Sequence, residues 1–215
     1  MPAINRFKYD IYCKIGILSQ NGHIILRTHP NIKKHIVRKI NYHIAVTLDG
    51  YICRDNGSID GLLMEGEHAD EFVQSLERYD SVLMGSNTYK FGFQFGLKAG
   101  QPAYPNLRHY IFSNSLDFDS SEAVNLIKGE VLETVRELKG MDGKEIWLCG
   151  GGELAGYLFD NDFLDKLTLK VNPVIFGSGR RLFGNSVKTA NFTLLSSKRY
   201  GNGVILSEYD IASSK

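Results

Sequence analysis

From residue 40 onward, short apolar runs alternate with segments whose apolar residues recur at helical spacing, and this alternation constrains the fold most. Such alternation is typical of a parallel sheet covered by helices. Within the helical segment Ala69–Arg78, Phe72, Val73 and Leu76 are expected on one buried face. The strand-like runs are Ile40–Val46, Ser81–Met84, His109–Ser113, Ala123–Ile127 and Glu145–Cys149, and the other helical segments are Glu130–Lys139 and Glu153–Phe159.

The last third of the chain has a different pattern. Leu167–Ile175 is typical of one more strand. Asn191–Tyr200 and Val204–Tyr209 flank Gly201-Asn202-Gly203, which predicts an antiparallel hairpin. The sequence therefore predicts an α/β fold with a mixed, mostly parallel sheet and helices on both faces.

Residues 1–39 differ from the rest of the chain. Asn21-Gly22 lies between two apolar runs within Lys14–Arg27 and predicts a hairpin, and Lys33–Lys39 is a small basic cluster. The cluster is either a surface patch for an acidic partner or a solvated linker, and the linker is favoured. We expect an N-terminal extension over residues 1–39 and one main domain over residues 40–215.

Charge and cysteine content exclude several classes of protein. A formal net charge of +1 gives no sign of a polyanionic partner, so nucleic-acid binding is not expected. No apolar run approaches the roughly 20 residues that cross a bilayer, and no cleavable apolar leader is evident. Three widely spaced cysteines, Cys13, Cys53 and Cys149, argue against a disulfide framework and for a reducing cytoplasm.

The strongest local signal is a run of glycines, Gly150–Gly152, between a strand and a helix. Glycines there let the backbone approach a ligand and expose the unpaired N–H groups of the helix start, which favour an anion such as a dinucleotide pyrophosphate. The alternative is a tight strand-to-helix turn without a ligand.

Two more strand ends carry polar residues. Met84-Gly85 is followed by Ser86-Asn87-Thr88, whose hydroxyls either cap a helix or meet a phosphate or ribose. Ser113-Asn114 ends another strand. Parallel strands bring such ends to one edge of the sheet, where open α/β sheets bind ligands.

Five segments, in this order, resemble the motif series of dihydrofolate-reductase-like proteins. They are Ala45–Ile52, Val82–Tyr89, Tyr110–Ser113, Leu148–Leu154 and Asn172–Phe183. The likeness is greatest to the reductase (C-terminal) domain family of riboflavin biosynthesis and its stand-alone bacterial relatives, and it covers about residues 40–210. It implies a three-layer α/β/α sandwich, NADPH held along the strand ends, and a homodimer.

The resemblance also implies roles for individual residues. The nicotinamide side would be lined by Ala45 and Val46, and the loop over the cofactor would contain Gly50, Tyr51 and Ile52. The adenosine phosphate end would lie at Gly85, Ser86, Asn87, Thr88, Ser113 and Asn114, and the pyrophosphate at Gly150, Gly151, Gly152, Glu153 and Leu154.

Two positions depart from the family. Ser86 stands where the family usually has arginine, and Asn114 stands where a basic residue is frequent. Both cations would face the 2′-phosphate that distinguishes NADPH from NADH. Lys90, Arg108 and Lys128 are the candidates to replace them, so the sequence leaves the choice between NADPH and NADH open.

Catalytic residues are less clearly marked, because hydride transfer is the chemistry of the cofactor. Asp70 is the first candidate for a substrate-facing proton donor or an anchor for a pterin-type ring, and Glu67 is the second; the alternative for both is a solvated acid in the first turn of a helix. Arg180 and Arg181 either contact substrate or phosphate or form a plain turn. Asp49 is interpreted as a turn residue.

The motifs of several other classes of enzyme are absent from the sequence. The chain has no Gly-x-Ser-x-Gly elbow, no phosphate-loop lysine after the glycines and no histidine pair with metal-ligand spacing, so no metal site is expected. We expect an NAD(P)H-dependent reductase that acts on a C=N or C=O bond of a small pterin- or pyrimidine-like heterocycle. The alternatives are a catalytically silent nucleotide-binding protein of the same fold, or an interaction role for residues 1–39.

Overall fold

The structure is a computed structural model, and it describes residues 37–212. The predicted hairpin and most of the basic cluster lie outside these residues, so the division into an extension and a main domain stays a prediction. Within residues 37–212, no helix is both long enough and apolar enough to cross a membrane.

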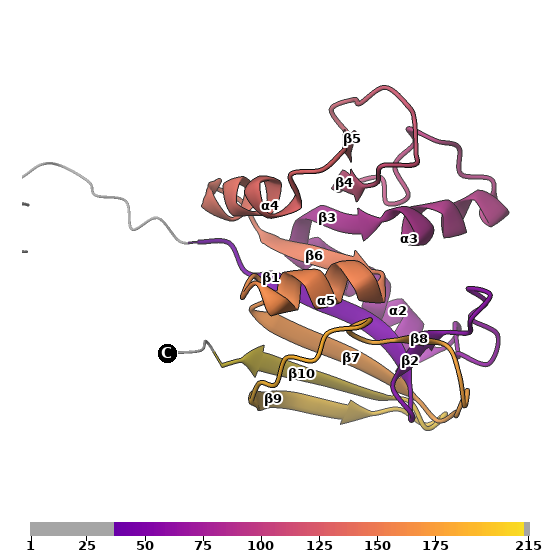
Figure 1. Ribbon diagram of the computed structural model, residues 1–215. Coiled ribbons are helices and arrows are strands. Elements are labelled where there is room, and N and C mark those ends of the chain that lie inside the picture. Colours follow the sequence, from indigo (N-terminus) through magenta and orange to yellow (C-terminus); the bar gives the residue numbers. More distant parts are fainter. Residues whose placement is uncertain (1–36, 213–215) are drawn as a thin grey trace, which may run out of the picture. The chain divides into compact units, whose positions relative to one another are not determined.

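An eight-stranded sheet forms the centre of this part, in the order β5-β4-β3-β6-β1-β7-β10-β9 (Figure 1). The first six strands of this order run parallel, and β10 runs antiparallel to both β7 and β9. The strands are β1 (Ile40–Thr47), β3 (Tyr79–Gly85), β4 (Arg108–Phe112), β5 (Val124–Ile127), β6 (Glu145–Gly150), β7 (Lys166–Asn172), β9 (Phe192–Arg199) and β10 (Ile205–Ile211).

Helices cover both faces of the sheet. Figure 1 shows α4 (Val131–Gly140) and α5 (Gly152–Asp160) in front of it and α2 (Glu67–Ser75) behind it. A 3₁₀ turn, Leu76–Arg78, continues α2. Helix α3 (Ser86–Phe91) comes directly after β3 and is continued by a second 3₁₀ turn, Gly92–Phe95. The predicted three-layer α/β/α arrangement is confirmed.

The hydrophobic core has two parts, one on each face of the sheet, because side chains alternate between the faces along each strand. On β1, Tyr42 packs in the cluster beneath α4 and α5, whereas His43, the next residue, contacts Phe72 of α2. On β6, Leu148 belongs to the first cluster and Trp147 to the second. Successive side chains of a strand point to opposite faces, so every second residue of β1, β6 and β7 faces α2.

Most predicted elements are confirmed to within a few residues, and the differences have local causes. Val73 is 64% exposed, so the buried side of α2 is narrower than predicted. Strand β7 ends at Asn172 because the next residue is Pro173, which has no N–H. A small second sheet was not predicted; it pairs β2 (Tyr51–Cys53) with β8 (Arg180–Arg181), strands too short to show a period.

The strand order brings the carboxyl ends of two strands together at one edge of the sheet. Strand β6 lies between β1 and β3, which both precede it in the chain. Met84 pairs with Gly150 in this register, so the carboxyl ends of β3 and β6 are adjacent. Ligands of open α/β sheets bind at such a reversal of strand order.

Candidate functional site

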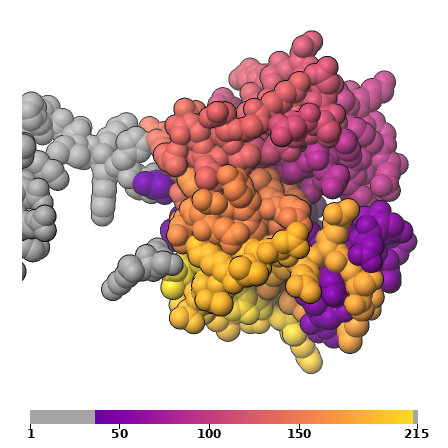
Figure 2. Space-filling model, viewed as in Figure 1, coloured from indigo at the N-terminus to yellow at the C-terminus, as the bar shows by residue number. Residues whose placement is uncertain are grey.

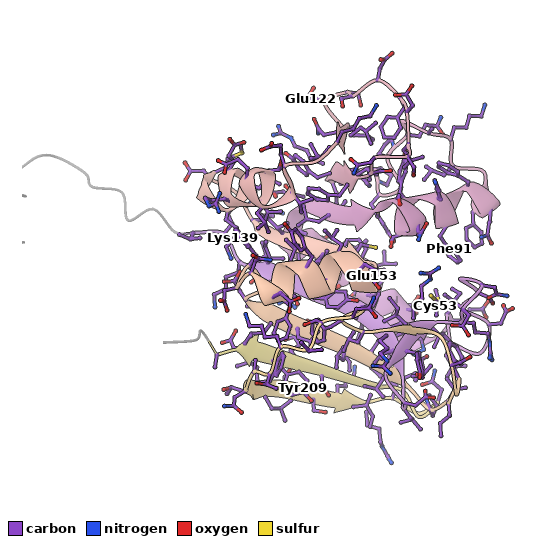
Figure 3. The ribbon with its side chains drawn as sticks, viewed as in Figure 1. Cys53, Phe91, Glu122, Lys139, Glu153 and Tyr209 are labelled. Carbon is purple, nitrogen blue, oxygen red and sulfur yellow. The ribbon has the colours of Figure 1, made fainter. Side chains whose placement is uncertain are left out.

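A cleft of about 1280 Å³ lies along the carboxyl edge of the sheet. Figure 2 shows the surface hollowed where α3, α5 and the β2 region meet. Three residues labelled in Figure 3, Phe91 of α3, Cys53 of β2 and Glu153 of α5, line the cleft from three separate elements. The cleft is therefore assembled from segments that are far apart in the sequence.

The first two glycines of the glycine run leave the backbone open to the cleft. Gly150 has φ +136°, and its peptide bond to Gly151 is cis. A Cβ added at Gly151 would meet only the hydroxyl of Thr88, at 3.4 Å. The cleft side of this turn is thus bare backbone with one hydroxyl beside it, which suits close approach of a phosphate.

The other glycines of the motif serve packing. A Cβ at Gly152 would overlap the carbonyl oxygen of Arg181, and one at Gly156 would overlap that of Phe183. Helix α5 therefore lies directly on the end of β8 and the residues that follow it. The turn interpretation thus holds for Gly152, and the anion-binding interpretation of Gly150 and Gly151 stays a prediction.

The hydroxyl residues at the start of α3 do not cap the helix. Gly85 is the N-cap residue and no side chain bonds to the helix start. Ser86, Asn87 and Thr88 line the cleft instead. This excludes the capping interpretation of Ser86 and Thr88 and leaves their hydroxyls available to a ligand.

The turn after β4, Ser113-Asn114, lies outside the cleft lining, although Phe112 at the end of β4 lines it. Ser113 Oγ accepts hydrogen bonds from the N–H groups of Ser115 and Leu116, at 3.2 and 3.0 Å, so it closes the turn after the strand. Asn114 is exposed and does not line the cleft. Lys90 lines the cleft nearby and lies 3.4 Å from Ser115 Oγ.

The three candidate replacements for the missing cations differ in position. Arg108 pairs with Glu122 at 4.0 Å and Lys128 pairs with Asp117 at 2.9 Å, and neither lines the cleft. Lys90 lines it and forms no ion pair with residues 37–212. Lys90 is therefore the best placed of the three.

The region expected beside the nicotinamide is only partly at the cleft. Ala45 and Ile52 line it, while Val46 is buried and Gly50 and Tyr51 lie outside the lining. Gly50 has φ +84°, a backbone conformation that favours glycine, in the turn between β1 and β2.

Asp49 holds that turn. Its carboxylate accepts a hydrogen bond from Thr47 Oγ1 at 2.6 Å and others from the N–H groups of Phe176 and Gly177. Desolvation alone would raise the pKa of Asp49, but these hydrogen bonds together outweigh it and lower the pKa. Asp49 thus fastens the β1–β2 turn to the loop after β7. Arg180 and Arg181 are exposed at the margin of the cleft.

The predicted acids of α2 lie outside the cleft lining. Asp70 and Glu67 are exposed, and Glu67 accepts a hydrogen bond from Lys198 at 2.9 Å. Glu71 does line the cleft, and it binds Lys198 and the hydroxyl of Tyr200. These hydrogen bonds, that of Lys198 first, lower the pKa of Glu71.

Sequence reasoning missed the polar residues that face α2 inside the cleft. His43 of β1, Lys170 of β7 and His68 of α2 all line it. His43 lies two residues before Ala45, so the period of a strand already places both on one face. The pairing of Ala45 with Lys170 across β1 and β7 could not be read from the sequence.

The cleft fits a nicotinamide dinucleotide in the character of its lining. It combines bare backbone at Gly150 and Gly151, the N–H groups at the start of α5 and the hydroxyls of Ser86 and Thr88. Within residues 37–212, no three His, Cys, Asp or Glu side chains form a group that could hold a metal ion.

Comparison with known proteins identifies one family, and a relative that matches over most of its length. The model of the RibD C-terminal domain family matches residues 38–206. The uncharacterized protein YwjB of Bacillus subtilis (strain 168) is 33% identical over 172 residues, which cover 79% of this chain and 96% of that protein.

Two solved structures share the fold. A protein of Shewanella sp. PV-4, which its name assigns provisionally to riboflavin biosynthesis, has a TM-score of 0.69 and 23% identity, over 81% of this chain and 99% of that one. Dihydrofolate reductase from Enterococcus faecalis, complexed with NADP(H) and RAB-propyl, has a TM-score of 0.56 and 13% identity, over 80% of this chain and 96% of that one. The resemblance found in the sequence is confirmed.

Proposed function

Because the chain belongs to the RibD C-terminal domain family, we propose that it is an NAD(P)H-dependent reductase that transfers a hydride to a C=N or C=O bond of a small pterin- or pyrimidine-like heterocycle. The observation that carries the proposal is the convergence of three strand ends on one cleft. Ala45 of β1, the end of β3 with the start of α3 (Gly85–Thr88) and the end of β6 with the start of α5 (Gly150–Leu154) line the same space.

The size of the cleft supports a site for two molecules. Its volume of about 1280 Å³ exceeds the roughly 300–1,000 Å³ of an ordinary ligand pocket. The bare backbone at Gly150–Gly151 and the start of α5 would hold the pyrophosphate, with Ser86 and Thr88 beside it. The α2 side of the cleft, lined by Ala45 and Phe72, would then receive the nicotinamide and the heterocycle.

When bound, the reduced nicotinamide supplies the hydride. The chain itself would position both molecules and exclude water from the space between α2 and the sheet. Lys90 is our candidate for recognition of the 2′-phosphate, since it is the cation at that end without a carboxylate partner among the described residues. A homodimer in the cytoplasm is part of the proposal; the family resemblance supports the homodimer, and the three widely spaced cysteines support the cytoplasm.

The position of the two predicted acids favours one alternative. Asp70 and Glu67 are exposed and lie outside the lining of the cleft. A chain of this fold without a proton donor would bind the cofactor and not turn over. This second candidate, a catalytically silent nucleotide-binding protein, makes the same prediction for cofactor binding and the opposite one for hydride transfer.

Titration of the purified full-length chain with NADPH and with NADH tests the proposal. Trp147 is the only tryptophan and it lines the cleft, so its fluorescence should be quenched by the reduced nicotinamide. We expect micromolar affinity for at least one cofactor. Absence of binding below about 1 mM, or roughly −4 kcal/mol, would contradict both the reductase and the silent binding protein.

An assay for turnover distinguishes the reductase from the silent binding protein. Oxidation of the bound cofactor is monitored by absorbance in the presence of dihydrofolate and pyrimidine analogues. Consumption of the reduced nicotinamide that depends on the added heterocycle supports the reductase. Binding without consumption across the panel favours the silent protein.

A further inference from the structure

Three nitrogen-bearing side chains, His43, His68 and Lys170, line the α2 side of the cleft, and we call them the imidazole–lysine cluster. His43 and Lys170 face α2 from neighbouring strands, because Ala45 pairs with Lys170 and His43 pairs with Thr168. His68 faces them from α2. The residues proposed to bind the cofactor do not include any member of this cluster.

The two imidazoles are buried and short of hydrogen-bond partners. His43 is 7% exposed and His68 is 3% exposed. Among the described residues, Nδ1 of His43 and both ring nitrogens of His68 have no partner. Edge-to-face contacts with Phe72 and Tyr200 hold the two rings in place. A buried polar atom without a partner is costly, and at a cleft it indicates a bound ligand or water.

The cluster carries one positive charge that its neighbours leave unneutralised. Lys170 donates a hydrogen bond to the carbonyl oxygen of Leu63 at 2.6 Å and forms no ion pair with residues 37–212. Two acids that line the cleft are engaged elsewhere, since Glu208 pairs with Arg78 at 2.5 Å and Glu71 pairs with Lys198. An ammonium has three donors, so two remain for a ligand.

The imidazoles themselves are neutral near pH 7. The pKa of His43 is lowered to about 4, first by burial and then by the charges of Arg78 and Lys170, which the charge of Glu208 opposes. Burial and then the charge of Lys170 lower the pKa of His68, and the charge of Asp70 opposes them. A neutral imidazole offers one donor and one acceptor, the pattern that reads alternating N–H and C=O groups on a ring.

We propose that the imidazole–lysine cluster is a binding subsite for a planar, acceptor-rich heterocycle, with Lys170 donating to a ring carbonyl or ring nitrogen and the imidazoles meeting the N–H and C=O groups beside it. The inference rests on the proposed function for the place of this ring, next to Ala45 and the nicotinamide. Hydride addition forms a C–H bond and moves the π electron pair onto the neighbouring oxygen or nitrogen. The ammonium of Lys170, beside the ring, would stabilise that negative charge.

Barbiturate is a suitable probe because it is a planar pyrimidine ring with three carbonyl groups and a delocalised negative charge. Uracil is its neutral counterpart, and inorganic phosphate tests for a general anion site. Binding is measured by calorimetry, and the ring-nitrogen resonances of ¹⁵N-labelled histidines report on His43 and His68 directly. The full-length chain is used with and without NADP⁺.

We expect barbiturate to bind and to shift the resonances of both histidines. Lys170→Met should weaken barbiturate binding about tenfold or more and uracil binding less. The matched control is Lys166→Met, which removes a lysine from the same strand and face but from outside the cleft lining, where it pairs with Glu145. It should bind barbiturate as the unmodified chain does. Lys170→Gln serves as the second variant if Lys170→Met does not fold.

Three results would overturn the inference: no barbiturate binding at about 10 mM, an unchanged affinity in the folded Lys170 variant, or phosphate binding as tightly through Lys170. NADPH is titrated into the same samples, which separates this inference from the proposed function. Lys170-dependent barbiturate binding without NADPH binding would contradict the reductase and leave the subsite. NADPH binding without barbiturate binding would contradict the subsite and leave the proposed reductase in place.

Discussion

The two halves of the cleft are built in different ways. The half that would hold the cofactor centres on open backbone at Gly150 and Gly151, with the hydroxyl of Thr88 as the nearest side-chain atom. The half under α2 consists of side chains, among them His43, His68 and Lys170. Backbone sites depend on local turns, whereas side-chain sites depend on which strands become neighbours. The cofactor half should therefore be sensitive to any added Cβ, and the α2 half to changes of charge.

Adjacent glycines offer the strongest test of this contrast. Gly152→Ala should destabilise the fold by about 3 kcal/mol, because its Cβ would overlap the carbonyl oxygen of Arg181, which is fixed backbone. Gly151→Ala should cost less than about 1 kcal/mol, since only the Thr88 hydroxyl lies near. It should instead lower cofactor affinity at least tenfold. Denaturant unfolding and NADPH titration measure the two effects, and equal destabilisation by both variants would contradict the distinction.

The buried histidine of the α2 half, His43, should make the stability of the fold depend on pH. The folded-state pKa of His43 is lowered from 6.5 to about 4, so the folded state resists protonation and stability is lost as the pH falls between these values. The contribution is on the order of 3 kcal/mol between pH 7 and pH 4. His43→Gln should lose that much less stability on acidification than the unmodified chain. Parallel unfolding curves at pH 7, 5.5 and 4 would show this; identical acid sensitivity would contradict it.

Lys90 tests whether the cofactor half also uses charge. Lys90→Met should weaken NADPH binding about tenfold and leave NADH binding unchanged, because only NADPH carries the 2′-phosphate. Lys128→Met is the control, since Lys128 already pairs with Asp117 and lies outside the cleft lining. Equal losses for both cofactors would assign Lys90 to the fold and not to phosphate recognition.

The smallest effect is expected at the acids predicted from the sequence. Asp70→Asn should change stability by less than about 0.5 kcal/mol and cofactor affinity less than twofold, because Asp70 is exposed and outside the cleft lining. Glu71→Gln, one residue further and inside the lining, should change stability more through loss of its bonds to Lys198 and Tyr200. A larger effect at Asp70 would restore it as a candidate proton donor.

The same contrast explains what could be predicted from the sequence. Strands, helices and the glycine turn are determined by periodicity and by residues a few positions apart, and the predicted fold and family are confirmed. The packing role of Gly152 could not be predicted, since it depends on a segment about 30 residues away. Lys170 was missed because its place beside Ala45 depends on the pairing of β1 with β7, for which no local pattern exists.

The position of β6 between β1 and β3 also bears on how the chain is made. Both flanking strands leave the ribosome before Glu145–Gly150 has been synthesised, so the sheet then lacks its middle strand. A nascent chain that ends before residue 145 can complete neither the hydrogen-bond ladder nor the glycine turn. Cofactor binding can therefore begin only late in synthesis. A nucleotide that binds only the folded chain, and not the unfolded one, would favour folding. The stabilisation of the folded chain would increase with the free concentration of the nucleotide.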